Sequence, residues 1–203
     1  MSKALIVVDV QNDFCEGGPL AVSGADEILA PINELIMSDV FDVVVLTQDW
    51  HPANHSSFKE NNGPWPRHCV QGTSGADFKS GLAIYPYDDL VTPWPKIIQK
   101  GMDPAIDSYS GFYDNDGKNP TGLTEYLKDM EIDEVYCVGL ALNFCVKATA
   151  LDAVKEGFKT FVYLPGCRGI STWLGEISHT IATMEQAGVK VVEKIPEIED
   201  KYA

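Results

Sequence analysis

Three residues that lie far apart in the sequence have the side chains needed for nucleophilic catalysis: Asp9, Lys100 and Cys145. Asp9 ends a hydrophobic stretch typical of a strand, and open α/β sheets place their ligand crevice at that end of the strands. Cys145 comes shortly after an apolar run that ends at Gly139, and the spacing predicts that it lies in the first turn of a helix. Unpaired amides and the positive end of the helix dipole favour a thiolate there, and the amides could bind an oxyanion.

Each of these residues also has a plainer interpretation. Asp9 could cap the turn after its strand, and Cys145 could be a small buried apolar side chain. Lys100 follows the apolar pair Ile97-Ile98, and most lysines are solvated. Beside a thiol, however, its charge would lower the thiol's pKa. The residue types alone leave both interpretations open.

The other four cysteines are weaker candidates for a nucleophile. Cys137 lies in the middle of a predicted strand and is interpreted as core. Cys15, Cys69 and Cys167 lie in predicted loops without comparable surroundings. Five cysteines are an odd number, and a chain of 203 residues does not need disulfides to fold. We therefore expect reduced thiols and a cytoplasmic location.

A second group of residues has the chemistry of a metal site. Asp49 and His51 are two residues apart after a predicted strand, so in extended backbone their side chains point to the same side. His55 and His68 follow. One aspartate with two or three histidines suits zinc, iron or manganese better than calcium or magnesium, although an adventitious cluster has a similar composition. His179 lies in the last predicted helix and is interpreted as structural.

The elements that must position these residues alternate between strands and helices. The predicted strands are residues 4–10, 43–47, 134–139, 160–164 and 189–192, and the predicted helices are 24–37, 121–129, 144–156 and 171–187. In the third helix, Phe144, Ala148, Leu151 and Val154 share the predicted buried face, and Gly157 ends the helix. This alternation predicts a three-layer α/β domain with right-handed crossovers.

The middle of the chain has a different composition. Residues 48–120 contain eight of the 12 prolines, three of the four tryptophans and three of the four histidines. Long loops inside a compact domain are usually functional or disordered, and aromatic-rich loops seldom remain disordered. We therefore expect one domain over residues 1–203 with an elaborate active-site region.

Composition excludes several classes of protein. The formal net charge is −15 and 45% of the residues are hydrophobic. Folding would remove about 70% of the surface of a chain of this length from water, so a sizeable core is expected. The acidic balance argues against nucleic acid and anionic membranes, which are recognised by clustered lysine and arginine. No apolar run is long enough for a membrane span, and the first residues leave no room for a signal peptide.

Six segments, in order, resemble the nicotinamidases of the isochorismatase-like cysteine hydrolase superfamily. They are ALIVVDVQNDFCEGGPLAV, TQDWHPANHSSF, WPRHCVQGTSGADF, the Lys100-Gly101 step, YSGFYDNDG and GLALNFCVKATALDA. The resemblance implies a three-layer αβα sandwich with a mostly parallel, Rossmann-like sheet, and a catalytic triad of Asp9, Lys100 and Cys145. It also implies a cis peptide bond between Leu140 and Ala141, which would aim the Ala141 and Cys145 amides at the oxyanion.

The same resemblance assigns one divalent metal ion and a substrate. Asp49, His51 and His68 match the metal ligands, with zinc expected and iron or manganese as alternatives, while His55 is held in reserve. The residues expected to bind the aromatic ring of the substrate are Phe14, Trp65, Tyr109 and Ala141. A homo-oligomer is compatible with the sequence but not required by it.

The expected activity is hydrolysis of nicotinamide to nicotinate and ammonia, in salvage of NAD. The nearest alternative is a metal-independent amidohydrolase of the same superfamily that acts on a carbamoyl or ureido compound, and it would not need Asp49, His51 and His68. Isochorismatase proper is disfavoured because those enzymes lack the nucleophilic cysteine. Two further alternatives are an interaction module that has lost catalysis and a protein that uses Cys145 as a redox sensor. Both could have the same fold without hydrolysing a substrate. One departure from the family pattern is Asn143, where many members have an acid.

Overall fold

The computed structural model describes residues 1–84, 95–171 and 173–199. One six-stranded sheet runs through it in the order β3-β2-β1-β4-β5-β6, and every neighbouring pair is parallel. The strands are β1 (Lys3–Val8), β2 (Val43–Asp49), β3 (Lys96–Lys100), β4 (Glu134–Gly139), β5 (Lys159–Cys167) and β6 (Lys190–Val192). This architecture confirms the predicted parallel α/β sheet.

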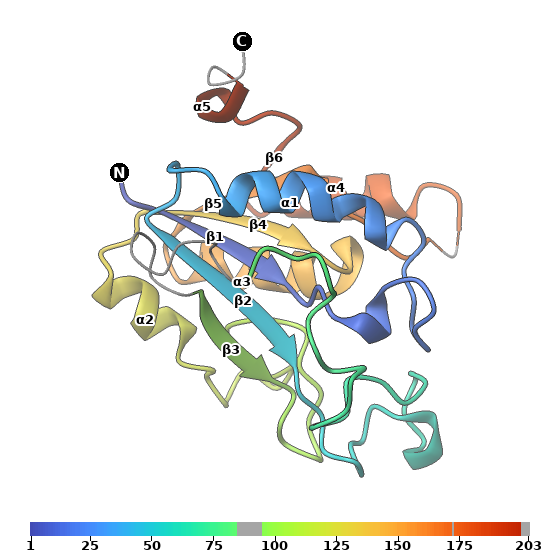
Figure 1. The fold of residues 1–203 in the computed structure, drawn as a ribbon. Coiled ribbons are helices and arrows are strands. Elements are labelled where there is room, and N and C mark those ends of the chain that lie inside the picture. Colours follow the sequence, from blue (N-terminus) through green and yellow to red (C-terminus); the bar gives the residue numbers. More distant parts are fainter. Residues whose placement is uncertain (85–94, 172, 200–203) are drawn as a thin grey trace.

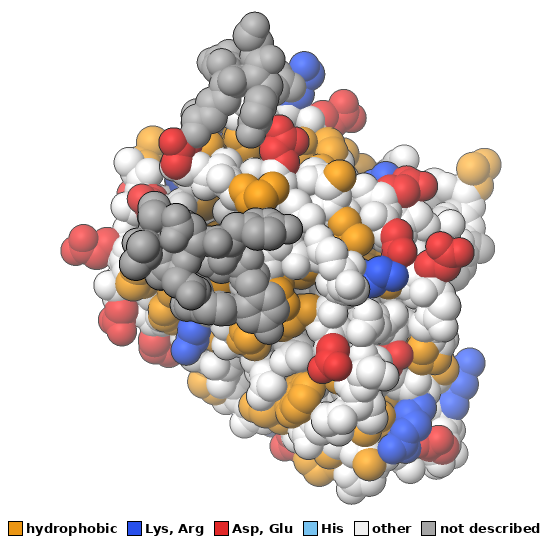
Figure 2. Space-filling model, in the orientation of Figure 1, with side chains coloured by type: hydrophobic (Ala, Val, Ile, Leu, Met, Phe, Trp, Pro, Cys, Tyr) orange, Lys and Arg blue, Asp and Glu red, His pale blue; other side chains and the backbone are white. Residues whose placement is uncertain are grey.

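The helices cover both faces of the sheet. They are α1 (Leu29–Ile36), α2 (Leu123–Asp129), α3 (Lys147–Lys155), α4 (Glu176–Gln186) and α5 (Pro196–Glu199). In Figure 1, α1 crosses the near side of the sheet and α3 lies on the far side, which gives the three predicted layers. Within the described ranges no helix has the length and apolarity needed to cross a bilayer. On the face drawn in Figure 2, acidic side chains are spread around the surface and the basic ones are isolated or in small groups.

Strand β3 was not among the predicted strands. Only Ile98 and Lys100 of its five residues are buried, while Lys96 and Ile97 are exposed, so the segment KIIQK lacks the continuous apolar run of a central parallel strand. It adds to the edge of the sheet beside β2, with Asp49 in register with Lys100. The strand that could not be predicted from the sequence is therefore the one that positions Lys100.

The face predicted for the third helix packs against the core but is only half-buried. The segment starts with a π-helical turn, Leu142–Val146, before the regular α3 begins. A π turn accommodates an extra residue and so rotates the faces that follow. As a result Thr149, Ala150 and Ala153 are buried, whereas the expected set of Phe144, Ala148, Leu151 and Val154 is only half-buried. Gly157, at φ +94°, ends the helix as predicted.

The carboxyl ends of four adjacent strands meet at one edge of the sheet. Val8 of β1 is in register with Thr47 of β2 on one side and with Gly139 of β4 on the other. Gly139 has φ +114°, and a Cβ there would lie 2.1 Å from the carbonyl oxygen of Val8, so only glycine lets the strands approach this closely. Chain segments that leave these strand ends carry the candidate catalytic residues.

Candidate active site

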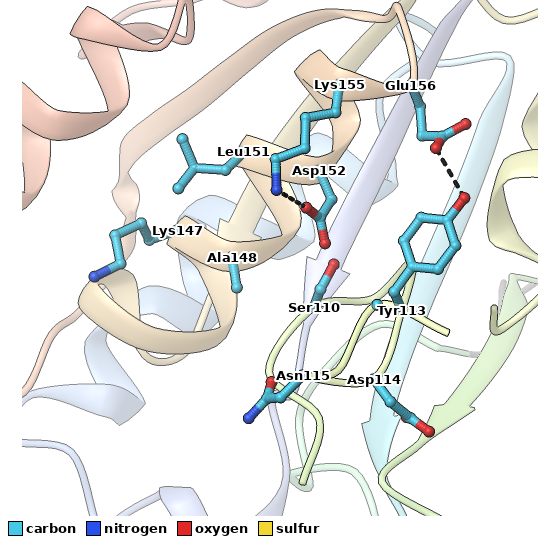
Figure 3. A pocket seen from close by; sticks show the side chains of 11 residues that line it. Ser110, Tyr113, Asp114, Asn115, Lys147, Ala148, Leu151, Asp152, Lys155 and Glu156 are labelled. Carbon is cyan, nitrogen blue, oxygen red and sulfur yellow. Dashed lines mark hydrogen bonds and ion pairs between the residues drawn. The ribbon is translucent and has the colours of Figure 1, made fainter. Parts of the chain in front are cut away.

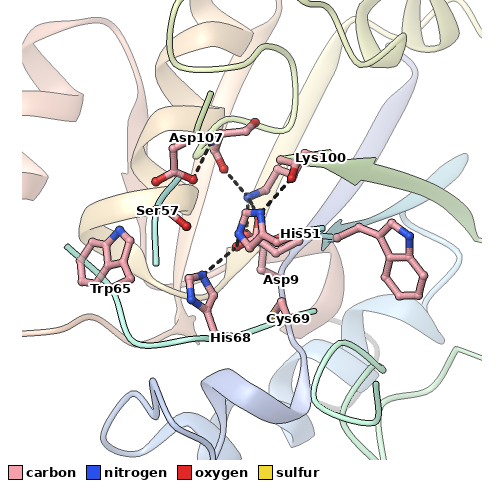
Figure 4. A network of polar contacts seen from close by, with 12 residues as sticks. Asp9, His51, Ser57, Trp65, His68, Cys69, Lys100 and Asp107 are labelled. Atoms are coloured by element: carbon pink, nitrogen blue, oxygen red, sulfur yellow. Dashed lines mark hydrogen bonds and ion pairs between the residues drawn. The ribbon is translucent and has the colours of Figure 1, made fainter. Parts of the chain in front are cut away.

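The structure brings Asp9, Lys100 and Cys145 together beneath this edge of the sheet. The Nζ of Lys100 lies 2.9 Å from Asp9 Oδ2 and 3.6 Å from Cys145 Sγ. A carboxylate oxygen of Asp9 and the sulfur of Cys145 are within 4.8 Å of each other. Asp9 and Lys100 are buried and Cys145 is 7% exposed. Figure 4 shows Lys100 pointing from the end of β3 toward Asp9 and the histidines.

Lys100 is held as an ammonium ion by acceptors around its nitrogen. It donates to the carbonyl oxygen of Ser108 at 2.9 Å and to Asp49 Oδ1, besides its ion pair with Asp9. Burial acts to lower the pKa of Lys100, but the carboxylates of Asp49 and Asp9 outweigh it and raise the pKa well above its usual value. The lysine is therefore a fixed positive charge beside the sulfur.

Asp9 is oriented by the end of the neighbouring strand. Thr47 Oγ1 donates to Asp9 Oδ1 at 2.6 Å and accepts from the Asp9 backbone N–H at 3.2 Å, while the backbone of Asp9 has φ +49°. Among the described residues, Asp9 Oδ2 accepts no directed hydrogen bond, although Lys100 lies in ion-pair range. Burial raises the pKa of Asp9, with the attraction of Lys100 opposing this and the charge of Asp49 adding to it. A carboxylate with a raised pKa beside the thiol of Cys145 is suited to accept a proton.

The thiol of Cys145 differs from its sequence-based expectation. Burial raises the pKa of Cys145 well above the usual value, Lys100 lowers it only in part, and the carboxylates of Asp9 and Asp49 add to the rise. The free protein thus carries a thiol rather than a preformed thiolate. Removal of its proton then requires a base, and Asp9 is the carboxylate placed to act as one.

None of the other four cysteines lines the cleft that Cys145 lines, although Cys69 lies near Asp49, Asp9 and Lys100. Burial raises the pKa of Cys15 to about 11 and that of Cys167 to about 12, and it raises those of Cys69 and Cys137 as well. Cys137 lies within β4, as predicted. The assignment of Cys167 to a loop was wrong, because it is the last residue of β5.

The turn that carries Cys145 contains the cis peptide bond that the family resemblance implied. The peptide bond between Leu140 and Ala141 is cis, and the π-helical turn starts at the next residue. Ala141 is half-buried and lines the same cleft as Cys145. The backbone amides of this turn are therefore close to the sulfur.

Asp49, His51 and His68 form a second cluster beside the first. The Nε2 atoms of His51 and His68 lie 3.5 Å and 3.9 Å from Asp49 Oδ2. Each histidine directs its other nitrogen to a backbone carbonyl: His51 Nδ1 donates to Gly101 at 2.9 Å and His68 Nδ1 to Pro66 at 2.7 Å. These bonds orient the two rings and turn both Nε2 atoms toward Asp49.

This donor set fits a divalent transition metal. Metal–nitrogen and metal–oxygen bonds of about 2.1 Å in a tetrahedral site place donor atoms roughly 3.4 Å apart, close to the separations found here. Although burial acts to raise it, the positive charge of Lys100 and the adjacent His51 hold the pKa of Asp49 well below its usual range, so this carboxylate is ionised. Asp49 thus joins the two clusters, with Oδ1 on the lysine and Oδ2 facing the histidines.

His55 has both ring nitrogens engaged by the protein. Its Nδ1 lies 2.7 Å from Ser57 Oγ and its Nε2 lies 3.2 Å from the carbonyl oxygen of Ile106. The ring stacks on His51 with centroids 4.0 Å apart. His55 therefore supports the ring of a ligand.

Replacing His68 with alanine is expected to weaken metal binding more than the roughly 10–100-fold typical of lost supporting residues, because a direct donor disappears. The matched control is His55→Gln, which keeps a hydrogen-bonding side chain beside His51 and should retain full metal content. Both variants would be analysed for metal per chain by mass spectrometry after dialysis against a weak chelator. Full metal content in the His68 variant, or equal loss in both, would contradict the assignment.

A narrow cleft opens onto the two clusters. Phe14, Trp65 and Ala141 line it, as expected for substrate-binding residues, together with Asp49, His68 and Cys145. The sequence-based set missed Leu20, Val22, Phe144 and Ile170, which also line it. Phe144 could have been found because it directly precedes the nucleophile, whereas nothing in the local sequence of Ile170 distinguishes it from core.

Tyr109, which was also expected to bind the substrate ring, is not among the residues that line this cleft. Its hydroxyl accepts a hydrogen bond from Trp65 Nε1 at 3.1 Å, and its ring meets Phe144 edge-on at 5.9 Å. Trp65 also meets Phe144 edge-on at 5.1 Å. Tyr109 therefore contacts two residues that line the cleft, Trp65 and Phe144, and fixes the orientation of Trp65.

A larger cavity of about 440 Å³ lies on the outer side of α3 (Figure 3). Its polar groups are largely paired with one another: Lys155 with Asp152 at 2.7 Å, and Tyr113 with Glu156 at 2.8 Å. The residues that line it include no cysteine or histidine. The chemistry of the chain is therefore concentrated in the smaller cleft.

Known proteins share this arrangement of sequence and fold. A nicotinamidase from Acinetobacter baylyi is 45% identical over 203 residues, covering 92% of this chain and 90% of that protein. A solved nicotinamidase/pyrazinamidase from Acinetobacter baumanii has a TM-score of 0.85 at 46% identity and covers 94% of this chain and 95% of that chain. The pyrazinamidase of Pyrococcus horikoshii in complex with zinc has a TM-score of 0.82 at 38% identity, covering 96% of this chain and 100% of that chain.

The match also holds at the level of the family. The model of the isochorismatase domain aligns with residues 3–194, a range that contains all six strands and both clusters of the cleft. The family model covers most of the chain, and relatives of similar length are well above 30% identical to it. These two observations are sufficient to assign the family. The chain belongs to the isochorismatase family.

Proposed function

We propose that this protein hydrolyses the carboxamide of nicotinamide, giving nicotinate and ammonia. The observation that carries the proposal is the cleft itself, in which a thiol, a lysine and an aspartate lie beside an aspartate–histidine cluster. The relatives named as nicotinamidases support it. We place the activity in the cytoplasm, in salvage of NAD, and assign it to a single domain over residues 1–203.

The reaction begins with proton transfer from sulfur to carboxylate. Asp9 takes the proton of Cys145 as the sulfur forms a bond to the carboxamide carbon, and the carbonyl oxygen becomes negatively charged. The charge of Lys100 stabilises the developing thiolate. We assign the amides of Ala141 and Cys145 to the oxyanion, since they belong to the turn that carries the sulfur.

Asp9 then returns its proton to the departing nitrogen. An amine is a poor leaving group unless it is protonated, so this step allows the C–N bond to break and ammonia to leave, with a thioester on Cys145. Water attacks the thioester carbon and gives one proton to Asp9. The C–S bond breaks, nicotinate is released, and the proton on Asp9 returns to the sulfur.

We propose that Asp49, His51 and His68 hold one zinc ion, with iron and manganese as the other candidates for this donor set. When bound, the ion would supply a Lewis acid that binds the pyridine nitrogen and fixes the ring. Phe14 and Trp65 would enclose the ring by aromatic contact. Tyr109 keeps Trp65 in the orientation that this contact requires.

The test is a panel of amides assayed for ammonia release with metal-replete protein. We expect turnover of nicotinamide and of pyrazinamide, which retains a ring nitrogen meta to the carboxamide. Benzamide, which lacks that nitrogen, is the matched control and should react at least about tenfold less efficiently, because a ring-nitrogen contact is lost. Turnover of a carbamoyl amino acid without turnover of nicotinamide would reject the proposal.

A further inference from the structure

Asn143 lies two residues before Cys145 and makes three hydrogen bonds from one buried amide. Its Nδ2 donates to the carbonyl oxygen of Ile170 at 2.7 Å and to Glu176 Oε1 at 2.9 Å. Its Oδ1 accepts from the backbone N–H of Ile170 at 3.0 Å. The side chain is 4% exposed. Asn143 thus pairs with both backbone groups of Ile170 and with the first residue of α4.

The contacts require an amide at position 143. A carboxylate could accept from the N–H of Ile170, but it has no proton to give to the carbonyl of Ile170 or to Glu176. An aspartate here would also place two carboxylates at hydrogen-bond distance in a mostly buried setting, where like charges repel strongly. The amide of Asn143 therefore complements the carboxylate of Glu176.

Ile170 connects this network to the cleft. It lines the cleft together with Phe144 and Cys145, and it lies in the connection between β5 and α4. The backbone N–H of Leu142 donates to the carbonyl of Arg168 at 2.8 Å in the same connection. At Gly169 a Cβ would come within 3.0 Å of Asn143 Oδ1, which shows how closely the two segments pack.

Cys145 itself is anchored by other means. Its turn is continuous with α3, and the N–H of Leu140 donates to the carbonyl of Val8 at 2.9 Å, which ties the start of the turn to β1. Loss of the Asn143 contacts would therefore displace Ile170 more than the sulfur. The expected consequence is weaker substrate binding with a largely preserved chemical step.

We propose that Asn143 and Glu176 form a positioning pair that fixes Ile170 as one wall of the substrate cleft. The proposal rests on the proposed function in that the substrate is a pyridine carboxamide. It adds a determinant of substrate affinity that makes no contact with the reacting atoms.

The decisive comparison uses Asn143→Asp, Glu176→Gln and the double variant. Asn143→Asp should raise KM for nicotinamide about tenfold, the usual effect of losing one or two buried hydrogen bonds, with kcat within about threefold of the starting protein. Glu176→Gln should stay near the starting KM, since its side-chain oxygen still accepts from Asn143. In the double variant the amide introduced at position 176 can donate to the carboxylate introduced at position 143. The direction of that hydrogen bond is then reversed, while the bond to the carbonyl oxygen of Ile170 is still missing, so part of the lost affinity should return.

A second measurement does not depend on turnover. The dissociation constant of nicotinate should rise in parallel with KM in Asn143→Asp, and exchange of the Ile170 amide proton should become faster. Ile170→Ala, which removes the side chain that lines the cleft, should raise KM by about the same factor as Asn143→Asp. The variant with both changes should have a KM close to that of either single variant. An unchanged KM in Ile170→Ala would reject the proposal without any need for Asn143→Asp, because Ile170 would then not contribute to substrate binding.

The outcomes separate the two proposals. Absence of nicotinamide turnover by the unaltered protein would reject the proposed function. Turnover by that protein with an unchanged KM in Asn143→Asp, or no recovery in the double variant, would reject the positioning pair. A fall in kcat with a lowered Tm and an unchanged KM would also reject it, because that pattern indicates only a structural role.

Discussion

Replacement of Cys145 by alanine is expected to lower kcat for nicotinamide by more than roughly 10⁴-fold. No other side chain that lines the cleft is a thiol or a hydroxyl that could take over the attack on the carbonyl. The variant should keep its fold and its metal content, because Asp49, His51 and His68 are all retained. Ammonia release, circular dichroism and metal analysis on one preparation would measure all three.

Cys137→Ala is the matched control for this loss. Cys137 is equally buried but lies within β4, away from the cleft. Its replacement should lower the free energy of unfolding by about 1–2 kcal/mol through a small cavity and leave kcat unchanged. Brief exposure to a nicotinaldehyde should label the peptide that contains Cys145. Labelling of the Cys15 or Cys69 peptide instead, or retained turnover in Cys145→Ala, would remove Cys145 as the nucleophile.

The sequence was informative where a residue follows a continuous apolar run. The runs that became β1 and β4 predicted that Asp9 lies at the carboxyl end of one strand and that Cys145 follows another. The structure confirms both positions and shows in addition that these two strands are neighbours. The i, i+2 spacing of Asp49 and His51 likewise predicted side chains on one side, and both face the same cluster. In each case a local pattern and a rule of sheet topology were sufficient.

The sequence was uninformative where position depends on distant packing. Strand β3 has charged ends and only two buried residues, so its pairing with β2 cannot be recognised from the segment itself. The hydrogen bond from Trp65 to Tyr109 spans 44 positions, and it decides that the tryptophan lines the cleft while the tyrosine supports it. Ile170 reaches the cleft through contacts with Asn143, 27 positions earlier.

The protonation state of the site could also not be predicted from residue types. A helix start and a nearby lysine argued for a thiolate, and both features are present. Full burial of the sulfur and the nearby carboxylates of Asp9 and Asp49 outweigh them and raise the pKa of Cys145. Lys100 forms ion pairs with Asp9 and Asp49, and its charge lowers the pKa of Cys145 only in part. Activation of the thiol therefore depends on Asp9.

Asp9→Asn is accordingly expected to lower kcat by about 10³–10⁴-fold, the scale of a lost general base. The amide has nearly the same shape, and its oxygen can still accept from Thr47, but it cannot take the proton of Cys145. In the unaltered protein kcat/KM should fall as the pH is lowered through the raised pKa of Asp9, since the ionised form is the base. Pre-steady-state measurement of the acyl-enzyme should show that its formation is the slowed step.

Asp49→Asn is the matched comparison, because the two aspartates share the same lysine but serve different clusters. Asp49→Asn should lose metal together with activity, whereas Asp9→Asn should keep the metal and lose only turnover. Thr47→Val, which removes the donor to Asp9 Oδ1, should cost about tenfold at most, as expected for one neutral hydrogen bond. Comparable loss of metal in both aspartate variants would mean that Asp9 acts as part of the metal site, and near-normal turnover in Asp9→Asn would mean that another group accepts the thiol proton.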